Sequence, residues 1–568
     1  MFNQQRKSMK KISTFLLAGA AVFGLAACNN EKGLNPEEGT TAGNTSARVT
    51  VSLATPTLKA AQPQVDEAGR EKENTITSMH LVGFVSKDWN TLVTSESTND
   101  GEFWKTAGGA YTVAPFEATA GTGSMAMALN KGDVTVTAVP LSTFGTKGTA
   151  IEDIAKLSTD DKFVMTSSAN KQTVIAGIKK EDAETGTDET KNVFKFNLER
   201  VVAQAFVSKK DGLDGNVKDG TGAVDLDGLT YSVMNGASST YVLTNQAGDR
   251  TMQEDGSYKN FKSFIHTKTV ADAKAADQNF LIRIGALGKD KNEDLGGYQA
   301  IAVSKKPYQT NGSETNRGIY FLENSSDADY TVEANRIDGY TRLATAKVYG
   351  TFAPKVVYGI KPGAEPKFTA VAGSHIWYKK TTKKETVGST VKTTITYTDR
   401  TISETKPTGT LESNQEWVEG RVKYDASNIV KLATFESGKT FYVGSTDDVI
   451  YDSIEAALSA GNEKVKTYLN GRCGYYGLLN RTVVPGVKYA DTRRNNIYAL
   501  AIASFSSRGF NWDPNDPNDP NLPKPDPKDP DQDPTPDHHD NDIEPQKGFM
   551  RCEATVLPWN LVTREVNL

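Results

Sequence analysis

The sequence predicts an all-β fold of two β-sandwich domains with few short helices. Thr, Val and Tyr recur in short runs, and Gly, Asn, Asp and Ser interrupt these runs at the intervals expected of turns. Gly is plentiful, with 48 residues. Because 568 residues exceed the size of one ordinary domain, two or more β-rich units are expected.

The N-terminus predicts export. Lys7, Lys10 and Lys11 precede an apolar stretch, residues 15–27, that is too short to remain in a bilayer as a spanning helix. The stretch closes with Leu25-Ala26-Ala27-Cys28, which resembles the signal of a bacterial lipoprotein. We therefore expect residues 1–28 to be a lipoprotein signal peptide with Cys28 as the lipidated residue, followed by a polar spacer.

The first strand is predicted by alternation, since Val49, Val51 and Leu53 alternate with Thr50 and Ser52. A charged loop with Gly and Pro follows at residues 59–74, and Arg70 lies in it. A loop of this composition is predicted to be exposed and open to proteases.

Further strands are predicted wherever β-branched and aromatic residues cluster, and the Gly/Asp-rich stretch 211–228 divides them into two groups. The domains are accordingly placed at 71–225 and 226–510. One helix is predicted at 453–460, and the Thr/Lys-rich segment 379–410 predicts a solvated hairpin with a long arm. The predicted strands are 76–85, 133–140, 192–197, 201–208, 229–234, 280–284, 344–352, 355–358, 393–397, 441–443 and 496–505.

The C-terminus ends in an Asp/Pro-rich tract, residues 513–545, and then an apolar segment. The tract predicts a flexible linker over 511–547, because Pro-rich and acidic chains do not bury a core. The segment 548–568 predicts a terminal strand that another surface receives. Its apolar residues include Val556, Leu557, Trp559, Leu561, Val562, Val566 and Leu568.

Chemistry-bearing motifs are scarce. None of the five His lies at a catalytic or zinc-ligand spacing, and neither a nucleophile elbow nor a phosphate-binding or dinucleotide-binding loop is present. The sequence therefore predicts no enzyme, no cofactor and no metal site, although it leaves open weak metal binding at His538-His539 and calcium binding by the tract. A net charge of -5 without a basic block beyond the leader excludes nucleic acid as a partner.

Cys473 and Cys552 are the cysteines that follow Cys28. Two thiols of an exported chain can form a disulfide, but the sequence does not place Cys552 within bonding distance of Cys473. A disulfide is left open.

The C-terminal third carries a specific combination of motifs. Arg493-Arg494-Asn495-Asn496 before a strand predicts a turn in which the guanidinium groups bond loop carbonyls. Together with Tyr475-Tyr476-Gly477, Ile497-Tyr498, the Asp/Pro tract and Pro558-Trp559, the string resembles Bacteroidetes-type fimbrillins, or type V pilins. The match is strongest over 475–568 and is closest to the shaft fimbrillin of the short, or minor, fimbriae.

The resemblance implies a fimbrillin fold of transthyretin-like sandwiches and a precursor attached to the outer membrane by lipid. It implies cleavage by an extracellular Arg-specific protease at Arg70, with Arg48 as the alternative, which removes the propeptide 29–70 and its strand. A neighbouring copy would then fill the groove by donor-strand exchange and build a surface fimbria that supports adhesion, with accessory fimbrial subunits as further partners. The implied donor residues in segment 548–568 are Val556, Leu557, Trp559, Leu561, Val566 and Leu568.

Two alternatives are kept. The first is a lipid-anchored surface glycan-binding protein that uses exposed aromatic residues, for which Trp377, Tyr378 and Trp512 are the candidates. The second is a tip or accessory fimbrillin, which shares much of this sequence but need not carry a donor strand.

Overall fold

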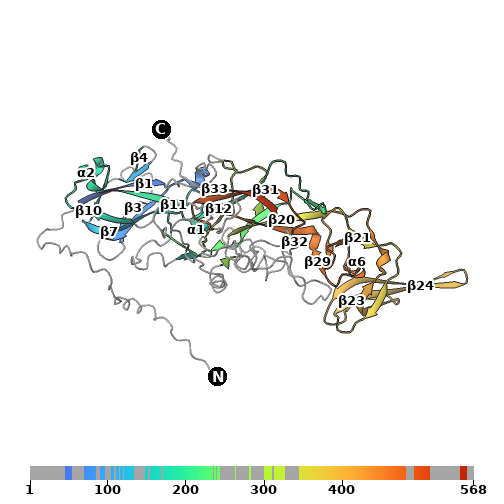
Figure 1. The fold of residues 1–568 in the computed structure, drawn as a ribbon. Coiled ribbons are helices and arrows are strands. Elements are labelled where there is room, and N and C mark those ends of the chain that lie inside the picture. The colour runs from blue at the N-terminus through green and yellow to red at the C-terminus, as the bar shows by residue number, and fades with distance from the viewer. Residues whose placement is uncertain are drawn as a thin grey trace, which may run out of the picture. The chain divides into compact units, whose positions relative to one another are not determined.

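Strands dominate the protein, as the sequence predicted, and the all-β fold is confirmed (Figure 1). The chain divides into two units, of which residues 1–43 lie outside the described part and residues 44–568 contain every described strand. The structure is a computed structural model that describes residues 45–53, 69–84, 90–95, 104–107, 110–113, 115–118, 120–132, 148–150, 154–167, 170–234, 236–237, 239–243, 263, 281–282, 300–309, 313–325, 344–480, 491–511 and 550–558.

The first sheet has ten strands in the order β3-β2-β7-β9-β11-β1-β5-β4, with β10 on β7 and β6 on β1. Strand β1 runs parallel to β11 and antiparallel to β5 and β6, so it is an interior strand. The bounds are β1 Thr45–Leu53, β2 Met79–Phe84, β3 Asn90–Ser95, β4 Trp104–Ala107, β5 Ala110–Val113, β6 Phe116–Ala118, β7 Gly121–Leu129, β9 Met165–Thr166, β10 Asn170–Val174 and β11 Val193–Arg200.

Two further sheets are built from strands on both sides of the predicted domain boundary. One has the order β19-β12-β31-β33, and the other the order β18-β14-β20-β30-β32 with β13 on β20. Strand β12 precedes residue 225 yet pairs in parallel with β31, and the boundary itself stays a prediction. The bounds are β12 Ala203–Lys209, β13 Gly222–Val224, β14 Thr230–Met234, β18 Ile301–Ala302, β19 Ile319–Phe321, β20 Thr345–Pro354, β30 Arg472–Leu478, β31 Asn496–Phe505, β32 Phe510–Asn511 and β33 Met550–Pro558.

The segment between β20 and β30 forms two smaller sheets, β26-β21-β28-β27-β29 and β22-β25-β23-β24. Strands β23 and β24 continue beyond their neighbours as a long hairpin, which confirms the predicted arm (Figure 1). The bounds are β21 Tyr358–Ile360, β22 Lys367–Ala370, β23 Ile376–Val387, β24 Thr390–Ile402, β25 Gln415–Lys423, β26 Ile429–Lys431, β27 Phe441–Gly444, β28 Ile450–Tyr451 and β29 Val465–Tyr468.

The remaining elements are short. Helix α6 has Ser453 as its N-cap, whose hydroxyl accepts a hydrogen bond from the Ala456 N–H, and it packs Ile454, Ala457 and Leu458 inward. None of the helices among the described residues has the length and apolar character needed to cross a membrane. The bounds are α1 Ile154–Leu157, α2 Lys180–Thr185, α6 Ile454–Ser459, β8 Gly148–Ala150 paired with β16 Ser239–Tyr241, and β15 Gly236–Ala237 paired with β17 Leu281–Ile282.

One continuous apolar core joins the first three sheets and extends to β27, β28 and β29 of the sheet beside them. Aromatic side chains fill it in tilted and stacked pairs, such as Tyr475 against Phe505 with ring centroids 4.9 Å apart and Phe441 against Tyr468 at 4.7 Å. Burial of rings of this size is a large part of the driving force for folding.

Most predicted strands coincide with observed ones, but two departures are instructive. Residues 355–357 form a turn between β20 and β21, so the strand predicted at 355–358 was wrong for all but its last residue. Strand β7 was missed because its sequence, GTGSMAMAL, is poor in the β-branched and aromatic residues that predict strands. The strand predicted at 133–140 lies outside the described residues.

Candidate functional site

The slot of β1 is the first part of the candidate site. Six residue pairs join β1 to β11, from Arg48 opposite Val193 to Leu53 opposite Leu198, and Thr50 and Val51 face β5 on the other side. Removal of β1 leaves the facing edges of β11 and β5 without their backbone partners. Arg48 lies inside β1, so a cut there leaves residues 49–53 in the slot.

Arg70, the predicted cleavage residue, is buried. Its side chain is 3% exposed, and the preceding Gly69 takes a left-handed φ of 71° that turns the chain into this position. The Arg70 N–H and Nε donate to the two oxygens of Glu73, at 2.7 and 2.9 Å. The expectation of an exposed loop was therefore wrong for Arg70, because partners distant in sequence cover it.

Those distant partners come from three parts of the chain. Arg70 Nη2 donates to Asp160 Oδ1 and to the Tyr320 hydroxyl, both at 2.8 Å, and Nη1 lies 3.8 Å from Glu314. The Tyr320 hydroxyl donates to Glu73, which completes a closed network. We call Arg70, Glu73, Asp160, Glu314 and Tyr320 the Arg70 cluster.

Three members of the Arg70 cluster have shifted pKa values, and burial, with the nearby Glu73, raises the pKa of Tyr320. Burial acts to lower the pKa of Arg70, but the hydrogen bond to Asp160 and the interactions with Tyr320 and Glu73 outweigh it, so the pKa is raised above its ordinary value. The hydrogen bond from Arg70 holds the pKa of Asp160 below its usual range. Both charges are thus maintained at neutral pH.

Asp160→Asn is expected to destabilise the protein at pH 7 by about 1 kcal/mol or less, since Asp160 is 38% exposed and partly screened. A depressed carboxyl pKa stabilises the fold above the unfolded-state value of about 3.9 and stops doing so as the pH falls through the folded-state value. Urea unfolding from pH 7 to pH 3 should therefore show the difference from the wild type closing in acid. Glu463→Gln, at an exposed acid, is the control; a gap that persists at pH 3 contradicts an electrostatic cause.

The string Arg493-Arg494-Asn495-Asn496 forms a buried turn before β31, as its residue types predicted. Arg494 is fully buried, and its Nη2 donates to Glu323 Oε1 at 2.6 Å and to Thr240 Oγ1 at 2.9 Å, while Nη1 donates to the Val242 carbonyl at 3.2 Å. Arg493 Nη2 lies 3.3 Å from Glu199 Oε1. These guanidinium groups hold loops rather than a ligand.

Another buried arginine, Arg200, joins this turn to the segment after Arg70. Asn495 takes a left-handed φ of 56°, and its Oδ1 accepts hydrogen bonds from the backbone N–H of Arg200 at 3.2 Å and from Nη1 at 3.0 Å. Arg200 Nε donates to the Glu73 carbonyl at 3.1 Å, and its Nη2 donates to Asn74. The residues just beyond the predicted cut are therefore fixed to the turn that starts β31.

The C-terminal strand β33 is an edge strand in its own chain. It pairs antiparallel with β31 from Met550 opposite Phe505 to Pro558 opposite Asn496, so Val556 and Leu557 face Tyr498 and Ile497 in the ladder. The other predicted donor residues, Trp559, Leu561, Val566 and Leu568, lie outside the described residues, as do Cys28 and the Asp/Pro tract.

Cys473 is a buried thiol in β30, and burial raises its pKa to about 12. The disulfide with Cys552 that the sequence left open is thus not formed in this structure.

Two aromatic candidates of the glycan-binding alternative, Trp377 and Tyr378, make hydrogen bonds within the fold. Tyr378 is 2% exposed and its hydroxyl donates to Glu455 at 2.9 Å, while the Trp377 indole N–H donates to the Ser403 carbonyl at 2.9 Å. Trp512 lies outside the described residues. Tyr378 therefore offers no platform for a sugar ring.

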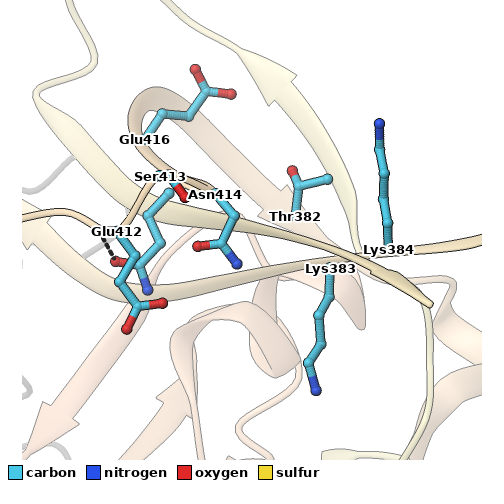
Figure 2. Close-up of a pocket in the computed structure, with 8 residues that line it drawn as sticks. Thr382, Lys383, Lys384, Glu412, Ser413, Asn414 and Glu416 are labelled. Carbon is cyan, nitrogen blue, oxygen red and sulfur yellow. Dashed lines mark hydrogen bonds between the residues drawn. The ribbon is translucent and has the colours of Figure 1, made fainter.

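An open hollow of about 1020 Å³ lies at the base of the β23–β24 arm, lined by residues 382–384 and 412–416. Lys383 and Lys384 leave the strand on opposite sides, and Glu412 and Glu416 are also set apart (Figure 2). The charged side chains that line the hollow do not point toward a common position, as catalytic groups would. In the part of the chain that the structure describes, no three His, Cys, Asp or Glu side chains are arranged to hold a metal ion.

The distant partners of Arg70 could not be predicted from the sequence. Glu73 is three residues away and was a local signal, but Asp160, Glu314 and Tyr320 are distant in sequence, and no spacing rule connects them.

No family model matches the chain. Among solved structures it is similar to a proposed cell adhesion protein from Parabacteroides distasonis, at 12% identity and a TM-score of 0.37 over 92% of this chain and all of that one. It is also similar to a fimbrilin from Porphyromonas gingivalis, at 11% identity and a TM-score of 0.38 over the same shares of the two chains. A truncated tip fimbrial protein of that organism matches 62% of this chain and 99% of its own, at 13% identity and a TM-score of 0.27. Likeness at this level carries no conclusion about function.

Proposed function

We propose that the protein is a structural subunit of a cell-surface fimbria, with the role of the main shaft subunit. It is exported as a lipoprotein with Cys28 as the lipidated residue, matured by an Arg-specific protease at Arg70, and polymerised when segment 548–568 of one copy enters the β1 slot of the next. The protein has no enzymatic role, and its partners are other copies of itself and accessory fimbrial subunits.

The observation that carries the proposal is the position of β1. The strand is interior, and the chain that leaves it reaches Arg70 before entering β2, so one cut after Arg70 separates β1 from the rest of its sheet. Strand β1 then remains by noncovalent contacts alone, and its departure exposes two backbone edges. A strand from another molecule can restore both.

Strand β33 suits that slot. Both β1 and β33 have nine residues, and both alternate apolar with polar side chains over most of their length. In sequence, Ala47, Val49, Val51 and Leu53 of β1 correspond to Cys552, Ala554, Val556 and Pro558 of β33, with polar residues mostly between them. Because the two strands have equal length and the same alternation, β33 can replace β1 with its apolar residues on the same face of the sheet.

The connection to β33 is far longer than its own sheet requires. Phe505, the last residue of β31, pairs with Met550, the first residue of β33, and β32 and residues 512–549 lie between them in the chain, whereas neighbouring antiparallel strands need about two to five connecting residues. At about 3.1 Å per residue, an extended Pro-rich chain of this length reaches on the order of 100 Å. Such reach supports donation of β33 to another subunit and a shaft role, since an open head-to-tail contact generates a fibre.

Burial of Arg70 adds a requirement to maturation. A protease must take the arginine side chain into its own pocket, so the Arg70 cluster has to open first, and the cleavage rate follows the open fraction when opening is fast. After the cut, the Glu71 amide nitrogen, now 3.1 Å from Glu314 Oε1, becomes an ammonium group beside that carboxylate. This new ion pair supports the cut form.

The test is controlled proteolysis of the purified precursor with an Arg-specific protease. We expect a product that begins at Glu71 and then forms fibres, and we expect Arg70→Gln to yield neither. Asp160→Asn should release Glu71-started product about fivefold faster, which corresponds to about 1 kcal/mol of easier opening.

Arg48→Gln is the matched control, and it should mature and polymerise like the wild type. A cut product that stays monomeric at high concentration contradicts strand exchange. Normal fibres from Arg70→Gln contradict the assignment of the cleavage residue.

A further inference from the structure

The end of the β23–β24 hairpin pairs with no further strand among the described residues. Strand β25 covers β23 only as far as Thr381, which pairs with Gln415, and beyond it the hairpin continues as two strands alone. We call residues 382–395 the arm. Every residue from Lys383 to Thr396 is exposed.

An arm of this kind is costly to hold in water. A two-stranded hairpin with both faces solvated is marginally stable, and apolar side chains on it remain hydrated. Val387, Val391 and Ile395 are 68%, 59% and 39% exposed, and they are three of the four large hydrophobic side chains found exposed among the described residues. Val391 and Ile395 lie on one face of the hairpin and Val387 on the other, and neighbouring exposed apolar side chains such as Val391 and Ile395 are typical of a contact surface.

The arm is also basic. It carries Lys383, Lys384 and Lys392 against Glu385 alone. Lys383 lies 3.5 Å from Glu385, whereas Lys384 and Lys392 have no ion pair with any described residue. Cross-strand pairing places Lys384 opposite Thr393 and Thr386 opposite Val391, so the face with Lys384, Val391 and Ile395 contains no acid.

The complementary charge lies in the chain's own Asp/Pro tract. Between Asp513 and Pro545 there are eleven Asp or Glu residues and two Lys, which gives about -9 against -5 for the whole chain. The rest of the protein is therefore net positive. The tract is the one strongly acidic segment of the sequence.

We propose that the arm binds the Asp/Pro tract, and that in the assembled fibre the tract belongs to a neighbouring copy. The assignment of the tract to a neighbouring copy rests on the proposed function, whereas the contact between arm and tract does not. Asp carboxylates pair with Lys384, and Pro rings cover Val391 and Ile395 on the same face, while Lys392 lies opposite Glu385 on the other face and adds to the positive charge of the arm.

Proline suits this contact because it has no N–H. A strand laid on the arm's edge needs donors along its backbone, whereas an extended Pro-rich chain satisfies its carbonyls with water and presents rings to an apolar face. In the repeat Asp513-Pro514-Asn515-Asp516-Pro517, Asp and Pro each recur every third residue, so each type falls on one side of a polyproline II helix.

Zero-length coupling of carboxylates to amines, followed by mass spectrometry, tests the contact on the full-length precursor and on assembled fibres. Fibres grown from mixed ¹⁴N- and ¹⁵N-labelled copies distinguish links within a copy from links between copies. We expect the tract to couple to Lys384 about fivefold more often than to the exposed Lys218, Lys306 and Lys361, and 1 M salt to remove the difference.

The triple variant Lys383→Glu, Lys384→Glu, Lys392→Glu should slow fibre growth at low salt, and Lys218→Glu, Lys306→Glu, Lys361→Glu, with the same change in net charge, should not. Equal coupling of the tract to both groups of lysines overturns the inference while leaving fibre formation intact. Links confined to single copies within fibres overturn the neighbouring-copy assignment. Arm-selective links in a precursor that never forms fibres overturn the proposed function and leave the arm as the tract's binding surface.

Discussion

Arg494→Met is expected to lower the free energy of unfolding by about 3–5 kcal/mol, the cost of breaking a buried ion pair from one side. Glu323 is 2% exposed, and without the guanidinium its charge is left inside the core. Thr240 and the Val242 carbonyl lose hydrogen bonds in the same change. Because Thr240 lies in β16 and Glu323 follows β19, loss of these bonds also loosens the contacts that hold the entry to β31.

Urea unfolding monitored by tryptophan fluorescence measures the change. Arg317→Met, at an exposed arginine, is the control and should cost less than about 0.5 kcal/mol. The double variant Arg494→Met, Glu323→Leu should recover part of the loss, because removing both charges is far milder than removing one. A single variant as stable as the wild type would mean that Glu323 finds water or another cation, and would falsify the structural role assigned to the string.

The sequence could predict elements whose local pattern and tertiary role agree. Strand β31 was predicted at its observed bounds, since an apolar alternation follows a turn-forming Asn, and α6 was predicted within one residue at each end from its cap and apolar face. Strand β7 failed this test: its Met and Ala residues carry no strand signal, and its neighbours β2 and β9 determine its conformation. The parallel pairing of β1 with β11, across most of the first sheet's sequence, has no local signal at all.

In the candidate site, too, some features could be predicted from local sequence and others could not. The turn character of Arg493 to Asn496 follows from residue type, but the acids that neutralise it, Glu199 in β11 and Glu323 after β19, are distant in sequence and cannot be named from spacing. For Arg70 the local composition indicated exposure, and long-range hydrogen bonds reversed it. The composition of a loop describes only the neighbours of a residue in sequence, whereas the burial of its side chain depends on its neighbours in space.

That burial changes how maturation is understood. In an exposed loop, cleavage would be limited by the protease alone. On the proposed function, with Arg70 held by Glu73, Asp160 and Tyr320, the folded precursor should resist cleavage until the cluster opens, so the contacts that stabilise the precursor would also set its rate of maturation.

The second large effect is expected from fixing β33 to its own chain. Ala501 and Glu553 are direct partners in the antiparallel ladder of β31 and β33. Opposed residues in such a ladder have Cα atoms about 4.5–5.5 Å apart, within the range that a disulfide accepts. Ala501→Cys with Glu553→Cys should therefore form a disulfide that holds β33 on β31, and the oxidised, cut protein should form no fibres.

Reversibility makes this experiment decisive. If strand donation builds the fibre, reduction of the disulfide should restore growth to the rate of the single variant Ala501→Cys, which controls for the substitution and for reaction with the native Cys552. The fold is retained throughout, unlike in a truncation of residues 549–568, which would leave β31 as a bare edge. Growth of the oxidised protein at the wild-type rate would show that β33 remains paired with β31 of its own chain during assembly. The β1 slot would then have to be filled by residues 559–568 alone or by another chain, and the matched length and alternation of β1 and β33 would lose their explanatory role.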